Sequence, residues 1–301
     1  MPDTPTVVVV GAASRDIDAA DPRGWRLGGT VTYSALAAAE VGVRVRALIG
    51  VDQEAAAAHE LDVLRDAGVE IHLVPLSRGP VFHNQPLPDG GRAQVAVSIS
   101  ESIPMSALPD AWRHPSAALL GPIAAELGDD WASAFSVPTR TALAWQGMLR
   151  SLDPGQPVRP LPPTRTSLIA SADALFISAE DVSGDMTPIH DLLGAGQQLV
   201  VTHGGYGAVH LSLGEHSKLD GRYLPPTPRR KPIDTIGAGD TFLGAWLAAT
   251  ALLAPATDPW RALLVASVTA SLSVVRVNLR DHPTRADICE ELVRLRDSRL
   301  G

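Results

Sequence analysis

The sequence predicts an α/β protein with a doubly wound sheet, and three patterns support this class. Strand-length apolar runs alternate with helical patterns from Thr6 to Val74. The same alternation returns from Ala117 onward. Between these stretches, two extended segments flank a turn-forming sequence, which is typical of a β-hairpin. We therefore expect residues 1–301 to form one domain, with a small sheet inserted at about 80–100.

The first half of the chain sets the alternating pattern. Thr6 to Val10 is an apolar, β-branched run that ends at Gly11, as expected of a buried parallel strand. The pattern then predicts a helix over Thr32–Glu40 closed by Gly42, a strand over Val43–Ile49, a helix over Ala55–Ala67 closed by Gly68, and a strand over Val69–Val74.

The predicted hairpin pairs Pro80–Leu87 with Arg92–Ser100 across Pro88-Asp89-Gly90-Gly91. Two interpretations fit this segment: a lid over a site, or an edge hairpin with no such role. In the lid interpretation we expect three side chains to reach inward, namely Phe82, His83 and Gln85.

The second half continues the α/β pattern and adds helices at the end. The Pro-rich segment Pro154–Pro163 is predicted to be an exposed loop, and Val209–Leu213 to pair with the segment before Pro225. Strands are expected over Ala117–Leu120, Thr141–Trp145, Ala174–Ile177 and Leu199–Thr202, and helices over Gly239–Leu253, Pro259–Val275 and Thr284–Arg296.

Bulk properties exclude several classes of protein. A net charge of −8 without a basic patch argues against a nucleic-acid partner. The apolar stretches fall short of a membrane span, so no membrane partner is expected. Cys289 stands alone, which rules out an intrachain disulfide and favours a cytoplasmic location. Neither lysine stands in a Walker A motif, so no phosphate-binding loop of that kind is expected. The absence of G-x-G-x-x-G after the first strand weakens a dehydrogenase hypothesis.

The most informative segment is Asp234-Thr235-Ile236-Gly237-Ala238-Gly239-Asp240-Thr241-Phe242, which precedes an apolar helical pattern. The first amides of a helix lack intrahelical partners and bind anions, and glycines let the backbone approach a ligand. A carboxylate beside such a site suits a group that takes a proton from an attacking hydroxyl. A simple helix cap after a glycine turn would also use Asp and Gly, but not the whole string.

This string resembles the C-terminal signature of the ribokinase-like (PfkB) carbohydrate and nucleoside kinases. The resemblance implies a ribokinase-like sandwich with a β lid inserted at about 14–28 and 80–100. It also implies an enzyme that uses ATP and Mg²⁺. It implies that Asp240 is the catalytic base and that the amides of Gly237, Ala238 and Gly239 form an anion hole. Members of the family often pair through their lid sheets, so the resemblance is compatible with a homodimer.

The same resemblance assigns an acceptor site after the first strand. Asp16 matches the family's substrate-binding Asp, and Gly28-Gly29 its glycine pair, although Asp18 or Asp21 can fill the first role instead. A carboxylate accepts hydrogen bonds from two adjacent hydroxyls, which suits a polyol. Tyr33 stands where the family usually has Asn, so the substrate surface is expected to be less polar.

Two further segments follow later strands. Gln146 and Arg150 resemble a Q-G-x-x-R pattern of some family members, in which the pair would meet substrate or phosphate; a turn with a solvated Arg fits equally well. Ser178 and Asp181, with Glu180 adjacent, match an N-x-x-E pattern that helps to hold Mg²⁺ through water. A helix-capping pair explains Ser178 and Asp181 as well.

The nucleotide side is predicted from the remaining signature residues. Thr202, Gly204 and Gly207 resemble the family's T-x-G-x-x-G phosphate loop. By the same resemblance the nucleotide also meets Asp234, Thr235 and Asn278, with the adenine near Ile233 and Ser273–Asn278.

The sequence therefore predicts phosphorylation of a hydroxyl on a small sugar, a cyclitol such as an inositol, or a nucleoside. The alternative is a kinase-like protein that binds a ligand or partner but has impaired catalysis. Ser178 and Tyr33 motivate that alternative, because both stand where the family usually has Asn.

Overall fold

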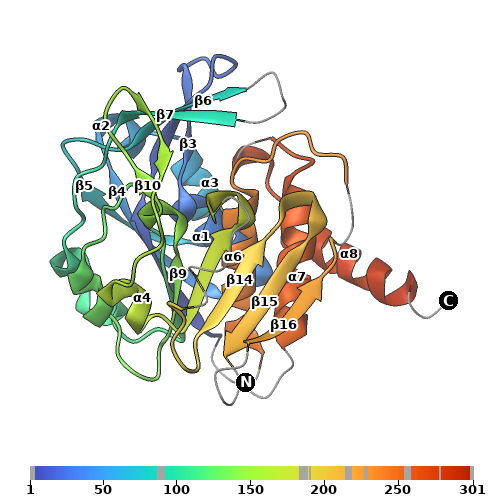
Figure 1. The fold of residues 1–301 in the computed structure, drawn as a ribbon. Coiled ribbons are helices and arrows are strands. Elements are labelled where there is room, and N and C mark those ends of the chain that lie inside the picture. The colour runs from blue at the N-terminus through green and yellow to red at the C-terminus, as the bar shows by residue number, and fades with distance from the viewer. Residues whose placement is uncertain are drawn as a thin grey trace.

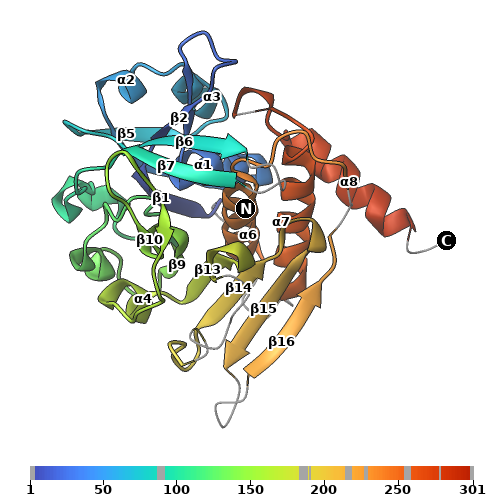
Figure 2. The same ribbon diagram turned by 45° about the horizontal axis from the view of Figure 1, so that its top comes forward.

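The computed structural model describes residues 4–86, 92–182, 189, 191–213, 219–226, 230–253, 259–277 and 279–298. Its centre is a nine-stranded sheet with the order β16-β15-β14-β13-β9-β8-β1-β4-β5, and a five-stranded sheet lies over one end of it (Figures 1 and 2). The seven strands from β14 to β5 are parallel, whereas β15 and β16 form an antiparallel edge. The α/β fold class predicted from the sequence is confirmed.

The elements have the following bounds. The large sheet contains β1 (Thr6–Ala12), β4 (Arg44–Val51), β5 (Glu70–Pro75), β8 (Ala117–Leu120), β9 (Arg140–Ala144), β13 (Ala174–Ser178), β14 (Gln198–Thr202), β15 (Ala208–Leu213) and β16 (Leu219–Leu224). The lid sheet has the order β11-β7-β6-β2-β3 and contains β2 (Ser14–Ile17), β3 (Trp25–Gly28), β6 (Val81–Pro86), β7 (Arg92–Ser98) and β11 (Gln156–Pro157). A small third sheet pairs β10 (Arg150–Ser151) with β12 (Arg159–Pro160).

The helices are α1 (Thr30–Val41), α2 (Gln53–Ala56), α3 (Glu60–Asp66), α4 (Ser167–Ser171), α6 (Ala238–Leu252), α7 (Pro259–Ser273) and α8 (Arg285–Ser298). Short 3₁₀ turns are η1 (Met105–Ala107), η2 (Asp110–Trp112), η3 (Asp129–Ser133), η4 (Gln146–Met148), η5 (Ala179–Val182), η6 (Gly204–Tyr206) and η8 (Leu279–Asp281). No helix among the described residues is both long and apolar enough to cross a membrane.

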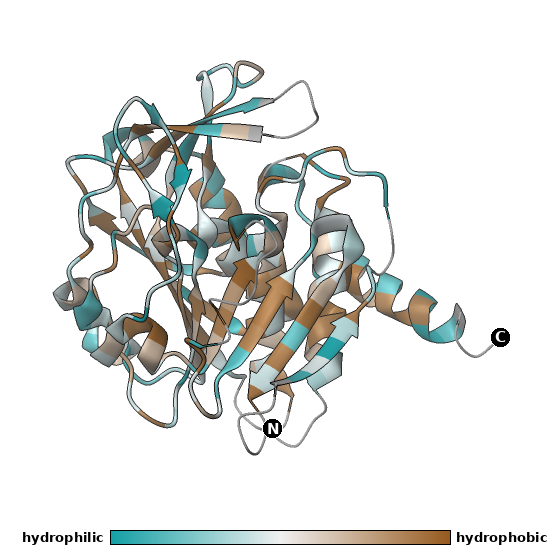
Figure 3. Cartoon of the chain, viewed as in Figure 1, coloured by the Kyte–Doolittle hydropathy of each residue, from teal (hydrophilic) through white to brown (hydrophobic). Residues whose placement is uncertain are grey.

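The valines of β1 show how the sequence produces a sheet that is buried on both faces. Val7 and Val9 belong to the core beneath α1, α6 and α7, whereas Val8 and Val10 belong to the core on the opposite face. All four side chains are fully buried. Successive side chains of a strand point to opposite faces, so an unbroken apolar run fills both cores. The central strands are accordingly brown in Figure 3.

Two expectations about single elements were wrong. The helix predicted over Ala55–Ala67 is two short helices, α2 and α3, and the break between them leaves Ala58 and Leu61 buried. The Pro-rich segment is not only a loop, because β11 extends the lid sheet and β12 pairs with β10. Proline lacks an N–H but tolerates an edge strand, and neighbouring amides supply the bonds: Gly155 N donates to Ala96 O at 2.7 Å.

The other predicted elements match the structure within a few residues. The predicted hairpin strands pair as β6 and β7, while its turn at 88–91 lies outside the described residues. The late hairpin is β15 and β16.

Helices α1 and α6 pack so closely that one glycine is required between them. A Cβ built on Gly244 of α6 would lie 2.1 Å from the backbone oxygen of Ser34 in α1. A side chain there forces the helices apart, and overpacking of this kind costs about 1–3 kcal/mol.

We therefore expect Gly244→Ala to lower the free energy of unfolding by at least about 1 kcal/mol, because steric clash outweighs the better helix propensity of alanine. Denaturant unfolding measures this difference. Gly205→Ala is the matched control, since no atom lies within 4 Å of a Cβ at that position. Equal stability of the two variants would contradict the close packing.

Candidate active site

A cavity of about 660 Å³ lies between the carboxyl ends of the parallel strands and the lid. Ligands of open α/β sheets bind at this end of the strands, and the volume is typical of a small-molecule site. One end of the cavity is lined by the lid strands, the other by α7, and the N-terminus of α6 lies between them.

The signature segment forms a tight turn into α6 inside this cavity. Gly237 precedes the helix with φ +74°, a left-handed conformation that favours glycine. Gly237, Ala238 and Gly239 all line the cavity, as does Asp240. The N-terminal amides of a fifteen-residue helix are thereby presented to the cavity beside a carboxylate.

Helix α1 holds Asp240 at two points. Thr30 Oγ1 donates a hydrogen bond to Asp240 Oδ1 at 2.7 Å, and Ser34 Oγ donates to the Asp240 carbonyl oxygen at 2.8 Å. Thr30 and Ser34 are one helical turn apart, so both hydroxyls lie on the same face of α1. The carboxylate is fixed in position before any ligand arrives.

The surroundings of Asp240 raise the pKa of its carboxyl group. Removal from water is the largest cause, and the charge of Asp181 acts in the same direction, whereas the hydrogen bond from Thr30 and the charge of Arg150 lower the pKa. A raised pKa makes this carboxylate a better proton acceptor than an exposed one.

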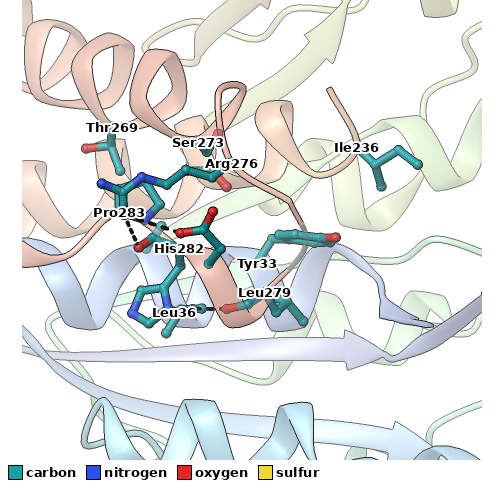
Figure 4. A pocket seen from close by; sticks show the side chains of 12 residues that line it. Tyr33, Leu36, Ile236, Thr269, Ser273, Arg276, Leu279, His282 and Pro283 are labelled. Atoms are coloured by element: carbon teal, nitrogen blue, oxygen red, sulfur yellow. Dashed lines mark hydrogen bonds and ion pairs between the residues drawn. The ribbon is translucent and has the colours of Figure 1, made fainter. Parts of the chain in front are cut away.

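Tyr33 packs against Gly237, at the start of the turn that leads into α6. A Cβ on Gly237 would lie 2.5 Å from the Tyr33 ring, so ring and backbone are in direct contact. The ring separates the main cavity from a small one of about 20 Å³, which Figure 4 shows between Tyr33, Arg276 and Leu279. The Tyr33 hydroxyl is buried and has no hydrogen-bond partner in the described part of the chain, and burial raises its pKa.

Asp16 lies at the lid end of the cavity together with Ser14. Its side chain is almost fully buried, and Ser14 Oγ donates to Asp16 Oδ1 at 3.3 Å. A Cβ on Gly28 would lie 2.4 Å from Asp16 Oδ2, so that glycine makes room for the carboxylate. Gly29 lines the cavity directly. The two alternatives for this role point elsewhere, because Asp18 faces Arg26 and Asp21 binds Arg23.

The inward face of the lid differs from the expected one. Phe82 lines the cavity, but His83 and Gln85 do not, and their places are taken by Asn84 and Gln94. Side chains alternate along a strand, so Phe82 and Asn84 share one face of β6 while His83 and Gln85 share the other.

The first two signature residues occupy different places. Thr235 lines the cavity. Asp234 is not among the cavity-lining residues and instead accepts from Arg26 Nη1 of β3 at 2.7 Å and from Ile236 N at 2.9 Å. This ion pair connects the lid sheet to the segment that leads into α6.

The polar corner after β9 and β13 contains the candidate metal residues. Gln146 Nε2 donates to Asp181 Oδ1 at 3.0 Å, and Ser178 N donates to Asp181 Oδ2 at 2.9 Å. Asp181 therefore also plays the capping role considered from the sequence. No group of three His, Cys, Asp or Glu side chains suited to a metal occurs among the described residues. Glu180 and Asp181 line the cavity, so this set fits a Mg²⁺ that arrives on phosphates rather than one held by protein alone.

The end of the cavity near α7 is lined by small side chains. Thr202, Gly204 and Gly207 lie there. Helix α7 contributes Ser267, Ala270, Ser271 and Val274 from its last turns and the residue beyond, which leaves space for a flat ring. Asn278 lies outside the described residues.

Several residues of the site were not anticipated. Thr30, Ser34 and Arg26 bind the signature segment, and Asn84 and Gln94 line the lid end of the cavity. Thr30 and Ser34 are hydroxyl residues four positions apart at the start of a buried helix, and this spacing is a pattern from which the sequence could have indicated them. The pairing of Arg26 with Asp234 spans 208 positions and leaves no local signal.

We compared the chain with known protein families, curated sequences and solved structures. Residues 160–285 match the model of the pfkB family of carbohydrate kinases. The fold of the chain is ribokinase-like, and its residues 160–285 resemble the PfkB carbohydrate kinases. No curated protein sequence matches it. The resemblance stated from the signature segment is thus confirmed, and the family match supports a small-molecule kinase.

Three solved structures illustrate the similarity of the ribokinase-like fold. The sulfate complex of a pyrophosphate-dependent kinase of the ribokinase family has a TM-score of 0.70 and 17% identity, covering 94% of this chain and 99% of its own. Ribokinase from Thermotoga maritima gives 0.67 and 17%, covering 96% and 99%. The nucleoside kinase of Methanocaldococcus jannaschii gives 0.68 and 17%, covering 96% and 98%.

The raised pKa of Asp240 predicts an effect on stability. A folded-state pKa above the unfolded value means that ionisation opposes folding, so the wild type loses stability as pH rises through the folded pKa. Asp240→Asn keeps an acceptor for Thr30 and removes the charge. We expect the variant to be more stable than the wild type near pH 7, by about 1.4 kcal/mol for each pH unit between the two pKa values.

Denaturant unfolding at several pH values measures this difference, which should vanish below about pH 4, where Asp is protonated in both states. Asp66→Asn, at an exposed position, is the control and should show no comparable gain. A destabilised Asp240→Asn variant at pH 7 would contradict the inferred charge penalty.

Proposed function

We propose that the protein transfers a phosphoryl group from ATP to a hydroxyl of a small sugar, cyclitol or nucleoside. The observation that carries this proposal is the position of Asp240, which lies between the acceptor end of the cavity and the N-terminal amides of α6. An acceptor hydroxyl bound at this position would lie beside both the base and the anion-binding amides, as phosphoryl transfer requires.

In the proposed reaction, Asp240 accepts the proton of the acceptor hydroxyl. The hydroxyl oxygen forms a bond to the terminal phosphorus, and the bond from that phosphorus to the bridging oxygen breaks, leaving its electron pair on ADP. The amides of Gly237, Ala238 and Gly239 stabilise the charge on the transferred group. When bound, Mg²⁺ would neutralise the donor phosphates, with Glu180 and Asp181 holding it through water.

The acceptor end supports a polyhydroxy compound. Asp16, Ser14, Asn84 and Gln94 offer several hydrogen-bonding groups within one wall, and Phe82 offers an apolar face. Such a mixture suits a ring that carries adjacent hydroxyls. Related folds include a kinase complexed with a pyrophosphate analogue and myo-inositol, and the nucleoside kinase described above.

The donor is proposed from the shape of the other end. Small side chains of α7 leave room for a base beyond the phosphate loop, which supports a nucleotide. A ribokinase of the same fold from Cryptococcus neoformans was solved with ADP, whereas three similar structures are of pyrophosphate-dependent kinases. Assays therefore need both donors, and a nucleotide is the expected one.

We also propose that two copies pair through the outer face of the lid. Ile17 and Val97 lie on that face and are 37% and 45% exposed. Light scattering should give a dimer mass for the wild type and a monomer mass for Val97→Glu, because a buried charge opposes pairing. A wild-type monomer at assay concentration would contradict the pairing.

Asp240→Asn should abolish nearly all turnover, by about 10²- to 10⁴-fold in kcat, because the amide cannot accept the proton. A panel of sugars, inositols and nucleosides with ATP and Mg²⁺, followed by ADP release, first identifies the acceptor. Asp18→Asn is the control, because Asp18 lies outside the cavity. Normal turnover by Asp240→Asn would contradict the role of the base.

The same panel separates the kinase from a catalytically impaired binding protein. Saturable nucleotide binding without ADP release from any acceptor would favour the binding protein. The panel is repeated with pyrophosphate in place of ATP, so that both candidate phosphoryl donors are tested.

A further inference from the structure

The turn that follows β8 contains a buried glutamate that the proposed reaction does not use. Only 1% of the surface of Glu126 is exposed. It is not among the described residues that line the cavity, so it has no direct contact with a ligand there. Burying a carboxylate is costly unless hydrogen bonds replace the lost water, so the partners of Glu126 indicate what it does.

The Glu126 carboxylate accepts hydrogen bonds from the backbone amides of two separate segments. On β1, Ala12 N donates to Glu126 Oε1 at 2.9 Å. Within the turn, Ile123 N donates to both carboxylate oxygens, at 3.2 and 3.0 Å, and Ala124 N donates to Oε2 at 2.8 Å. A buried carboxylate with these amide partners is well satisfied, and it connects the two segments.

The bond to Ala12 takes the place of a strand neighbour. Gly121 N donates to Val10 O at 2.8 Å, beyond the last paired residues of β8 and β1. The backbone groups of a strand alternate in direction, so Ala12 N points to the same side as Val10 O. Strand β8 has ended at that level, and Glu126 accepts the bond instead. The carboxylate thus holds the end of β1, from which the chain continues into β2 and Asp16.

The turn itself has a strained backbone. Ala125 has φ +56°, and it is the one residue other than glycine with a left-handed φ in the described part of the chain. A side chain disfavours this conformation, which persists only where surrounding contacts hold it. The bonds from Ile123 and Ala124 to Glu126 close the turn around Ala125 and supply such contacts.

The turn touches the acceptor end of the cavity at more than one point. Ile123 lines the cavity, and together with Ala124 it packs against Phe82 of the lid. A Cβ built on Gly121 would lie 2.8 Å from Cγ2 of Thr30, the residue that donates to the candidate base. A shift of the turn would therefore change the shape of the acceptor end.

Resting on the proposed kinase function, we infer that Glu126 is a positioning residue for the acceptor. Its carboxylate fixes the end of β1, which leads to Asp16, and the turn that carries Ile123, so that these two parts of the lining keep their relative positions. The donor end of the cavity, near α7, is built from other segments and does not depend on this carboxylate.

A purely structural role makes a different prediction. Glu126 would then affect only the free energy of unfolding, and a folded variant would keep the wild-type KM for both substrates. The positioning role separates the two substrates, because only the acceptor binds against the segments that Glu126 connects.

The test compares Glu126→Gln with Gln197→Glu, two substitutions that preserve size. In Glu126→Gln, an N–H donor replaces one oxygen and faces amide donors. Gln197 is also buried and bonded to backbone atoms, since its Nε2 donates to Ile169 O and Ala172 O at 2.6 and 2.7 Å. It precedes β14 and therefore lies at the opposite end of the sheet from the cavity.

With the acceptor identified by the panel, we expect the KM for the acceptor to rise about 10-fold in Glu126→Gln, because small displacements of binding groups are costly. The KM for ATP should stay at the wild-type value, and kcat should change less than the KM for the acceptor. Gln197→Glu should lose stability and keep both KM values.

Hydrogen exchange gives a readout that needs no turnover. In Glu126→Gln, the amides of residues 12–16 and 123–126 should exchange faster than in the wild type, whereas those of β14 and α7 should not change. Glu126→Asp keeps the charge on a shorter side chain, so smaller effects on exchange and on the KM for the acceptor are expected. This second variant carries the test if Glu126→Gln does not fold.

An unchanged KM for the acceptor in the folded variant, an equal rise in the KM for ATP, or unchanged exchange at residues 12–16 and 123–126 would overturn the inference about Glu126. A wild type without turnover of any acceptor, combined with faster exchange of these amides in the variant, would support the role of Glu126 in holding the lining and contradict the proposed kinase instead.

Discussion

The close packing of α1 on α6 is the contact on which the site depends. Gly244 lets the two helices touch at Ser34, and this contact brings Thr30, Tyr33 and Ser34 against the first turn of α6. These side chains hold Asp240 and Gly237 in addition to the backbone hydrogen bonds of their own segment. The same contact is part of the core beneath the sheet, so the stability of the fold and the geometry of the candidate site depend on one interface.

The cost of this arrangement is a destabilising charge. Asp240 is partly buried, and both its desolvation and the charge of Asp181 disfavour its ionised form. The hydrogen bond from Thr30 and the charge of Arg150 offset part of that penalty. Such conflicts between stability and chemistry concentrate at functional sites.

Local pattern was enough to predict the central strands, the long helices and the signature turn. Valine runs, glycine caps and Gly-Ala-Gly-Asp act over a few residues, so their consequences can be derived without knowing the fold. The side chains that orient the site lie far away in sequence. Arg26 reaches Asp234, and Arg150 reaches Gln94 and Asp181, only after the sheets have formed.

The wrong expectations have equally local causes. His83 and Gln85 were expected to face inward together with Phe82, although strand alternation separates them. The Pro-rich segment lacked a strand pattern, yet its non-proline amides pair with β7.

The short strand β11 changes how the lid can move. It binds one edge of the lid sheet through the segment that follows β10, while β3 at the other edge runs directly into α1. A sheet clamped along both edges behaves as an arch and not as a hinged flap. Raising this sheet as one rigid body would require the pairing of β11 with β7 to break.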